Sequence, residues 1–204
     1  QVATAAPDGY TLLFSAASNI NLVPQLQKLN FDPVKQLVPI TNVGTGTQIL
    51  AVHRSVAAAT LPELIAYARA HPGKLNYTSA GTQNVSHLAP VLLFAQAGID
   101  LVHVPAKSGP QAVSDILSGQ VEVYFGNSSE LLPHRNSDKI RLIATGAGKR
   151  IAAAPDLPTV GETIPGFEMS SWNGFSAPVG TPEPILETLR SEIAALVQSP
   201  AVFE

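Results

Sequence analysis

Short apolar runs alternate with segments of helical periodicity along most of the chain. Runs rich in β-branched and aromatic residues, bounded by turn-forming residues, indicate strands. The expected strands are Tyr10–Ser15, Ile40–Val52 interrupted at Gly44–Thr47, Leu75–Tyr77, Leu101–Val104, Val121–Phe125 and Ile140–Thr145, followed by an extended segment at Phe167–Ala177. The expected helical segments are Leu61–His71, Val85–Gln96, Gln111–Ser118 and Pro184–Val197, with shorter ones at Ile20–Leu26, Glu130–His134 and Thr159–Thr163. This alternation predicts an α/β fold with mostly parallel sheets and flanking helices.

Several helix boundaries can be read from single residues. Thr60 and Glu63 have the spacing of a capping box before Leu61. Thr181 is the expected cap of the last helix. The segment Phe31–Ile40 contains two prolines and is predicted to be a loop.

The stretch Lys74–Leu88 is the strongest candidate for a binding site. A short strand leads into a loop of small and polar residues, and a helix then begins at Val85. The candidate ligand-binding residues of this stretch are Thr78, Ser79, Ala80, Gly81, Thr82, Asn84 and His87. The loop backbone can approach a ligand closely, and the N–H groups from Ala80 to Asn84 with the helix dipole would hold a carboxylate. The alternative is an ordinary loop whose polar residues only cap the helix.

Three further polar loops follow predicted strands and add candidate ligand-binding residues. These are Ser18 and Asn19, Lys107, and Asn127. Ligands of open α/β sheets bind at the carboxyl ends of strands, where these loops lie. Two of these sites have a structural alternative, since Ser18 or Asn19 can cap a helix and Lys107 can be solvated. Trp172 lines a cleft or packs in the core, and His87 contacts a ligand or steadies the loop.

Composition narrows the function. The 204 residues carry a net charge of −3, only 13% are charged, and no basic run exceeds Lys149-Arg150, which argues against nucleic acid as a partner. There is no cysteine, and no apolar run approaches the ~20 residues of a membrane span. The five histidines lack metal-ligand spacing, and no nucleophile–base motif occurs. We therefore expect no catalytic residue, metal or cofactor, with a serine hydrolase as a remote alternative.

A series of colinear motifs resembles a known family over essentially the whole chain. In chain order they are Ala6–Leu13, Pro72–Tyr77, Ser79–Gly81, Ser86–Ala89, His103–Pro105 with Lys107, Asp115–Val121, Lys149-Arg150, Pro155–Val160 with Glu162, Pro165–Phe167, Ser171-Trp172 with Gly174, Ala177-Pro178 and Gly180–Pro182. The chain resembles the Bug family, the extracytoplasmic solute receptors of tripartite tricarboxylate transporters. Relative to that family it looks truncated at both ends, and its last residues, Ser199–Glu204, look like the start of a helix.

The resemblance implies a periplasmic, monomeric binding protein with two α/β lobes and a ligand cleft between them. Residues 1–45 and 167–204 would form one lobe and residues 46–166 the other. The implied ligands are small carboxylates: dicarboxylic and tricarboxylic acids, acidic amino acids, nicotinate and aromatic acids. The implied partners are the permease subunits of the transporter, or a sensor kinase if the protein serves signalling.

The chain also departs from the family pattern at four positions. Gln83 stands where glycine is common, Asn84 where threonine is, Ala106 where an aromatic residue is, and Gly126 where aspartate is frequent. These departures point to an altered or larger ligand, or to relaxed specificity.

Overall fold

The computed structural model describes residues 1–82 and 84–199. Gln83 and the expected helix start at residues 200–204 lie outside them. The chain divides into two compact units, unit 1 with residues 1–45 and 171–204, and unit 2 with residues 46–170. The division into lobes at 45/46 and 166/167 stays a prediction.

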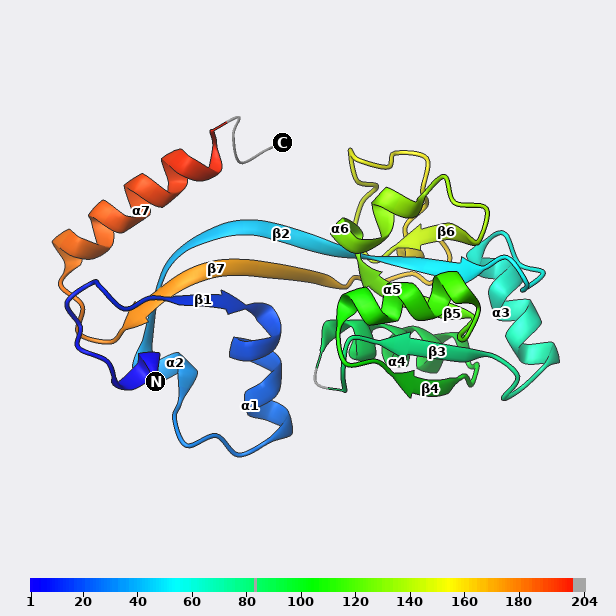
Figure 1. The fold of residues 1–204 in the computed structure, drawn as a ribbon, viewed down its shortest axis with the longest axis horizontal. Coiled ribbons are helices and arrows are strands. Elements are labelled where there is room, and N and C mark those ends of the chain that lie inside the picture. Colours follow the sequence, from blue (N-terminus) through cyan, green and yellow to red (C-terminus); the bar gives the residue numbers. More distant parts are fainter. Residues whose placement is uncertain (83, 200–204) are drawn as a thin grey trace. The chain divides into compact units, whose positions relative to one another are not determined.

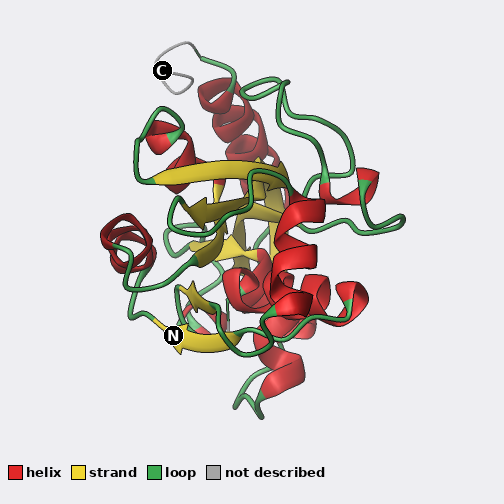
Figure 2. Cartoon of the chain, turned by 90° about the vertical axis from the view of Figure 1, so that its right-hand side faces the viewer, coloured by secondary structure: helices red, strands yellow, loops and turns green. Residues whose placement is uncertain are grey.

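Unit 2 is an α/β unit with a mixed sheet (Figures 1 and 2). Its elements are the second half of β2 (Leu37–His53), α3 (Leu61–Ala70), β3 (Asn76–Ser79), α4 (Val85–Ala97), β4 (Val102–Pro105), α5 (Gly109–Ser118), β5 (Val123–Asn127), α6 (Ser128–Leu131), η3 (Leu132–His134), β6 (Ile140–Thr145) and η4 (Val160–Glu162). The strand order is β2-β5-β3-β4, and β6 pairs with the other edge of β2. Helices cover both faces of this sheet.

Alternation along the strands divides the core of unit 2 into two clusters. Leu50 and Val52 of β2 point to the face that α3 and α4 cover, together with Tyr77. Ile49 and Ala51 point to the opposite face, which α5 covers. Because side chains alternate between the two faces, the face of a residue in β2, β3 or β5 follows from its number, whereas β6 shifts register between Ala144 and Leu142.

The helices of unit 2 begin and end at residues with clear local signals. The side chains of Thr60, Asn84 and Ser108 accept hydrogen bonds from the first turns of α3, α4 and α5. Gly98 and Gly119 end α4 and α5 in the left-handed conformation, with φ of 62° and 75°. These signals place the two crossover helices where the sequence predicts them.

Unit 1 has a smaller core. Its elements are η1 (Val2–Thr4), β1 (Leu13–Ala16), the π-helical turn η2 (Ser18–Leu22), α1 (Val23–Leu26), α2 (Pro33–Gln36), the first half of β2, most of β7 (Ser170–Pro178) and α7 (Glu183–Val197). β7 lies between β1 and β2. Ile40, Ala177 and Leu186 form the buried cluster, which Phe175 and other half-buried side chains extend.

The α/β class is confirmed, but the prediction of mostly parallel sheets is wrong. Among the described strands, parallel pairing is confined to β3 with β4 and β5. β2 is antiparallel to both β5 and β6, and β1 is antiparallel to β7. The crossover helices α4 and α5 connect the parallel strands β3, β4 and β5, whereas β2 runs antiparallel to β5 although α3 connects β2 to β3.

Two local predictions in β2 and before it are also wrong. The segment Phe31–Ile40 is not a loop, because the Asp32 side chain caps α2 and β2 begins at Leu37. The glycines of Gly44–Thr47 do not interrupt β2, which continues to His53.

The predicted helix caps in unit 1 are wrong, because other residues occupy the N-cap positions. Thr181 is not the cap of α7; its hydroxyl donates to the Pro178 carbonyl at 2.8 Å, and Pro182 occupies the N-cap position. Ser18 and Asn19 lie inside the π-helical turn, whose N-cap position is Ala17, so neither caps it.

No helix within residues 1–82 and 84–199 is long and apolar enough to cross a membrane. The same residues contain no group of three or more acidic or histidine side chains arranged to hold a metal ion.

Candidate functional site

Most of the candidate residues lie at one edge of the sheet in unit 2. β3, β4 and β5 are parallel, so their carboxyl ends reach the same edge. Gln48 of β2 pairs with Asn127 of β5, and Thr145 of β6 pairs with Ile49. The loops after Ser79, after Pro105 and after Asn127 therefore emerge together, as the sequence predicts.

The loop between β3 and α4 is held by its own side chains. The Asn84 Oδ1 accepts from the N–H of Ser86 at 3.0 Å and caps α4. The Ser79 hydroxyl donates to the Gly81 carbonyl at 3.2 Å. Gly81 has a φ of +113°, and a Cβ at this position would meet no atom of the described residues within 4 Å. The backbone at Gly81 therefore faces open space that a ligand can enter.

One of the expected backbone donors is already used. The Ala80 N–H donates to the Ser86 Oγ at 2.9 Å, and Ser86 is buried. The prediction that the Ala80 amide grips the ligand is therefore wrong, because this N–H is consumed inside the loop. The N–H groups of Gly81 and Thr82 donate to no other residue in the described part of the loop.

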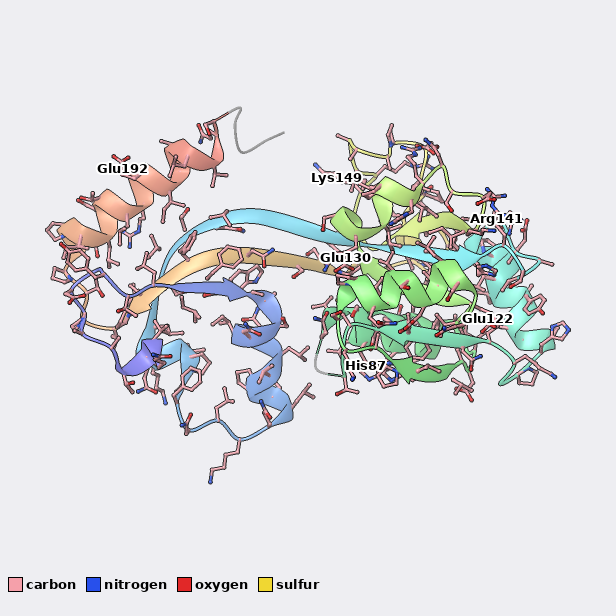
Figure 3. All side chains as sticks on the ribbon, in the orientation of Figure 1. His87, Glu122, Glu130, Arg141, Lys149 and Glu192 are labelled. Atoms are coloured by element: carbon pink, nitrogen blue, oxygen red, sulfur yellow. The ribbon has the colours of Figure 1, made fainter. Side chains whose placement is uncertain are left out.

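A stack of aromatic rings lies beneath the loop. The rings of His87 and His103 are 4.2 Å apart, and that of Tyr77 is 4.7 Å from His103. The Nε2 of His103 is 2.8 Å from the Ser79 Oγ, and the Tyr77 hydroxyl is 3.4 Å from the Nδ1 of His87. Figure 3 labels His87 in this region. The stack is bonded to the start of the loop through His103 and Ser79.

Burial favours the neutral form of both imidazoles. Desolvation lowers the pKa of His87 below its usual 6.5. Desolvation and the neighbouring His87 lower the pKa of His103 as well. Sequence reasoning missed His103 as a site residue. Its pairing with Tyr77 across β3 and β4 is the signal, but that register requires the fold.

One of the candidate residues of this stretch points elsewhere. Thr78 is fully buried and, by alternation, lies on the sheet face opposite Ser79. Its side chain therefore faces α5 rather than the loop. Thr82 is exposed, as is Lys107 in the loop before α5.

Asn127 has a partner that sequence reasoning missed. The Gln48 Nε2 donates to the Asn127 Oδ1 at 2.8 Å. Gln48 is 1% exposed, whereas Asn127 is half-buried. A glutamine directly before the buried run Ile49–Val52 is the signal that could have revealed it.

The position where the family pattern favours aspartate is covered by a tyrosine ring. A Cβ at Gly126 would collide with the ring of Tyr124. The Tyr124 hydroxyl donates to Glu130 Oε2 at 2.7 Å, and burial with this contact raises the pKa of Tyr124. Glu130, labelled in Figure 3, also contacts Gly109 at the start of α5.

The remaining candidates belong to unit 1. Ser18 is half-buried and Asn19 is exposed in the η2 turn. Trp172, on β7, is half-buried and lines a largely apolar cavity of about 550 Å³. Ile20, Pro33, Leu37, Asn42 and Phe175 are among the other lining residues. This cavity lies within unit 1.

The fold is that of two-lobed periplasmic binding proteins. A solved periplasmic transporter matches with a TM-score of 0.90 and 33% identity over 98% of this chain and 68% of its own. A Rhodopseudomonas palustris protein with adipate matches with a TM-score of 0.88 and 28% identity, over 98% of this chain and 68% of its own. MatC from the same organism, with bound malate, matches with a TM-score of 0.85 and 29% identity, over 98% of this chain and 69% of its own.

The family follows from a match over the whole chain. Residues 1–204 match the family described as "Tripartite tricarboxylate transporter family receptor", TctC, and the chain belongs to it. It is 33% identical to a UPF0065 protein of Bordetella bronchiseptica over 98% of this chain and 60% of that protein. It is 31% identical to Protein BugT of Bordetella pertussis over 99% of this chain and 63% of that protein. The chain thus spans about three fifths of these relatives, and the predicted family is confirmed.

Proposed function

We propose that this protein is an extracytoplasmic receptor that captures a small organic carboxylate for a tripartite tricarboxylate-type transporter. The observation that carries the proposal is the β3–α4 loop. Its Gly81 backbone faces open space beside the N-terminus of a thirteen-residue helix, α4. Donor N–H groups and the positive end of the helix dipole favour a carboxylate there. Malate and adipate in two similar proteins support the same ligand class.

The finer parts of this function rest on the family. They are the periplasmic location, the monomeric state, the permease partners and a ligand held between the lobes, and each stays a prediction. A role in sensing with a kinase would use the same binding loop. Restored carboxylate uptake when the protein is added to vesicles that carry the permease would favour transport over sensing.

The binding test is calorimetry against a panel of mono-, di- and tricarboxylates and acidic amino acids. Gly81→Ala places a methyl group in the open space beside the loop and should weaken binding. Gly73→Ala is the matched control, since Gly73 also has a positive φ and no atom within 4 Å of its Cβ position, in the turn after α3. A silent panel, or equal weakening by both variants, would refute the proposal.

One observation favours testing a hydrolase as the second candidate. Ser79 Oγ and His103 Nε2 are within the distance of a nucleophile and its base. Two features oppose catalysis. Ser79 is completely buried, and no carboxylate within the described residues is hydrogen-bonded to His103. Hydrolysis of p-nitrophenyl acetate that disappears in His103→Gln would favour the enzyme, and a rate equal to that of buffer would exclude it for this ester.

A further inference from the structure

Gln48 is a buried polar residue at the binding edge of unit 2. Leu50 and Val52 of the same strand point to the sheet face covered by α4, so Gln48 points to that face as well. Ser79 and Asn127 lie on this face for the same reason. Gln48 therefore shares both the edge and the face of the loop proposed to bind the carboxylate.

The amide of Gln48 is only half satisfied. Its Nε2 donates to Asn127, but its Oε1 is buried and accepts from no group among the described residues. Buried side-chain oxygens without a partner are rare in folded proteins. Leaving one unpaired costs about 1–3 kcal/mol. A side-chain amide oxygen accepts hydrogen bonds and cannot donate one. The group that pairs with Gln48 Oε1 must therefore carry an N–H or O–H.

We propose that Gln48 determines specificity by accepting a hydrogen bond from a hydroxyl or amino group that the ligand carries in addition to its carboxylate. The inference rests on the proposed function and narrows the ligand to hydroxy or amino acids. β2 and β3 are separated by β5, which puts their axes about 10 Å apart. A short substituted acid with its hydrogen bonds can span that distance.

The sheet offers a matched control for Gln48. Thr145 is also fully buried at this edge, and its Oγ1 also lacks a partner among the described residues. It pairs with Ile49, whose side chain belongs to the opposite face. Thr145→Val therefore removes an equivalent polar group that does not face the loop.

The test compares acids that differ by one donor: malate and aspartate against succinate, citrate against tricarballylate, and lactate against propionate. Calorimetry on the wild-type protein should show the donor-bearing acid of the preferred size binding at least about ten-fold tighter. Gln48→Met keeps the length of the side chain and removes the amide. It should abolish this preference by weakening the substituted acid and leaving its unsubstituted counterpart unchanged. Thr145→Val should retain the preference.

Several outcomes would overturn the inference while leaving the proposed function intact. They are equal binding within each pair by the wild-type protein, tighter binding of the unsubstituted acid, and equal weakening of both acids in Gln48→Met. The last result would indicate a structural role or an ordered water at Oε1. If Gln48→Met fails to fold, as judged by circular dichroism, Gln48→Asn withdraws the oxygen by one carbon and must reduce the preference. A silent panel refutes the proposed function itself.

Discussion

The hydroxyl oxygen of Ser86 accepts a hydrogen bond from the backbone N–H of Ala80 across the β3–α4 loop, at 2.9 Å. The N–H of Ser86 in turn donates to the Asn84 side chain at 3.0 Å. One residue in the first turn of α4 is thus bonded to both ends of the loop. This arrangement holds the two ends of the loop in place before any ligand arrives, which lowers the entropy lost on binding.

Loss of the Ser86 hydroxyl should therefore loosen the loop. Ser86→Ala leaves the Ala80 N–H without its partner, and we expect a loss of about 1–3 kcal/mol in the free energy of unfolding. Carboxylate affinity should fall as well, because the loop is no longer pre-ordered. Urea denaturation and calorimetry measure the two effects. Ser129→Ala, at a position on α6 outside the loop, should change neither. Unchanged stability of Ser86→Ala would contradict the role of this bond.

Removing the Asn84 cap should affect both the stability of the protein and the binding of the carboxylate. Asn84→Ala should destabilise the protein by about 1 kcal/mol, the usual value of an N-cap. Thr60→Ala removes the corresponding cap of α3, where the Thr60 oxygen accepts from Glu63 N–H. Both variants should lose similar stability in denaturant, but only Asn84→Ala should bind the carboxylate more weakly. Equal affinities in the two variants would show that the Asn84 cap is purely structural.

Stability should decrease at acidic pH because of the stacked imidazoles. The folded pKa values of His87 and His103 lie below 6.5, the ordinary value that the unfolded chain retains. Between the folded and unfolded values the unfolded chain binds more protons, so stability is lost as the pH falls through this window. The melting temperature should fall on acidification below about pH 6.5, less steeply in His87→Gln. Imidazole titration by NMR checks the direction, and a folded pKa above 6.5 would refute it.

Arg150 and Glu162, which belong to the family motifs, form an ion pair within unit 2. Arg150 forms a two-pronged ion pair with Glu162, at 2.7 and 2.9 Å. The Arg150 hydrogen bonds and the Thr159 N–H lower the pKa of Glu162 to about 2. Arg150→Gln should raise this pKa toward its ordinary value of 4.5, measurable by NMR titration of the carboxyl carbon. An unchanged pKa would show that Thr159 alone sets it.

The sequence predicted those parts of the fold that depend on local chemistry. The helices after Thr60 and Asn84 begin where their caps indicate, and β6 has the predicted bounds. The direction of β2 could not be predicted, because residues of Ile40–Val52 alternate identically whichever way the strand runs. The prediction of a loop at Phe31–Ile40 is wrong because Pro33 is compatible with the first turn of a helix as well as with a loop.

The candidate site could be predicted only in part, because strand pairing cannot be read from local sequence. Asn84 follows from its position before α4, and its role as the cap is confirmed. Gln48 and His103 come from distant strands, and their relation to the loop depends on how the strands pair. The bond between Ser86 and Ala80 reverses the expected role of that amide, and no spacing rule indicates it.

Gly126 stands where the family pattern favours aspartate. Any Cβ at this position would collide with the ring of Tyr124, which is fully buried and anchored through its hydroxyl to Glu130. Gly126→Ala should therefore cost about 1–3 kcal/mol by overpacking. Gly46→Ala, on β2 with no atom within 4 Å of its Cβ position, is the control and should be neutral within about 0.5 kcal/mol.

The collision makes the two sites interdependent. In a Tyr124→Leu background the ring is gone, so adding Gly126→Ala should cost less than it does in the wild-type protein. The two substitutions should deviate from additivity by about 0.5–3 kcal/mol in guanidinium denaturation. The same cost in both backgrounds would show that the ring yields to a side chain at 126. An aspartate side chain at position 126 could then be accommodated in this protein.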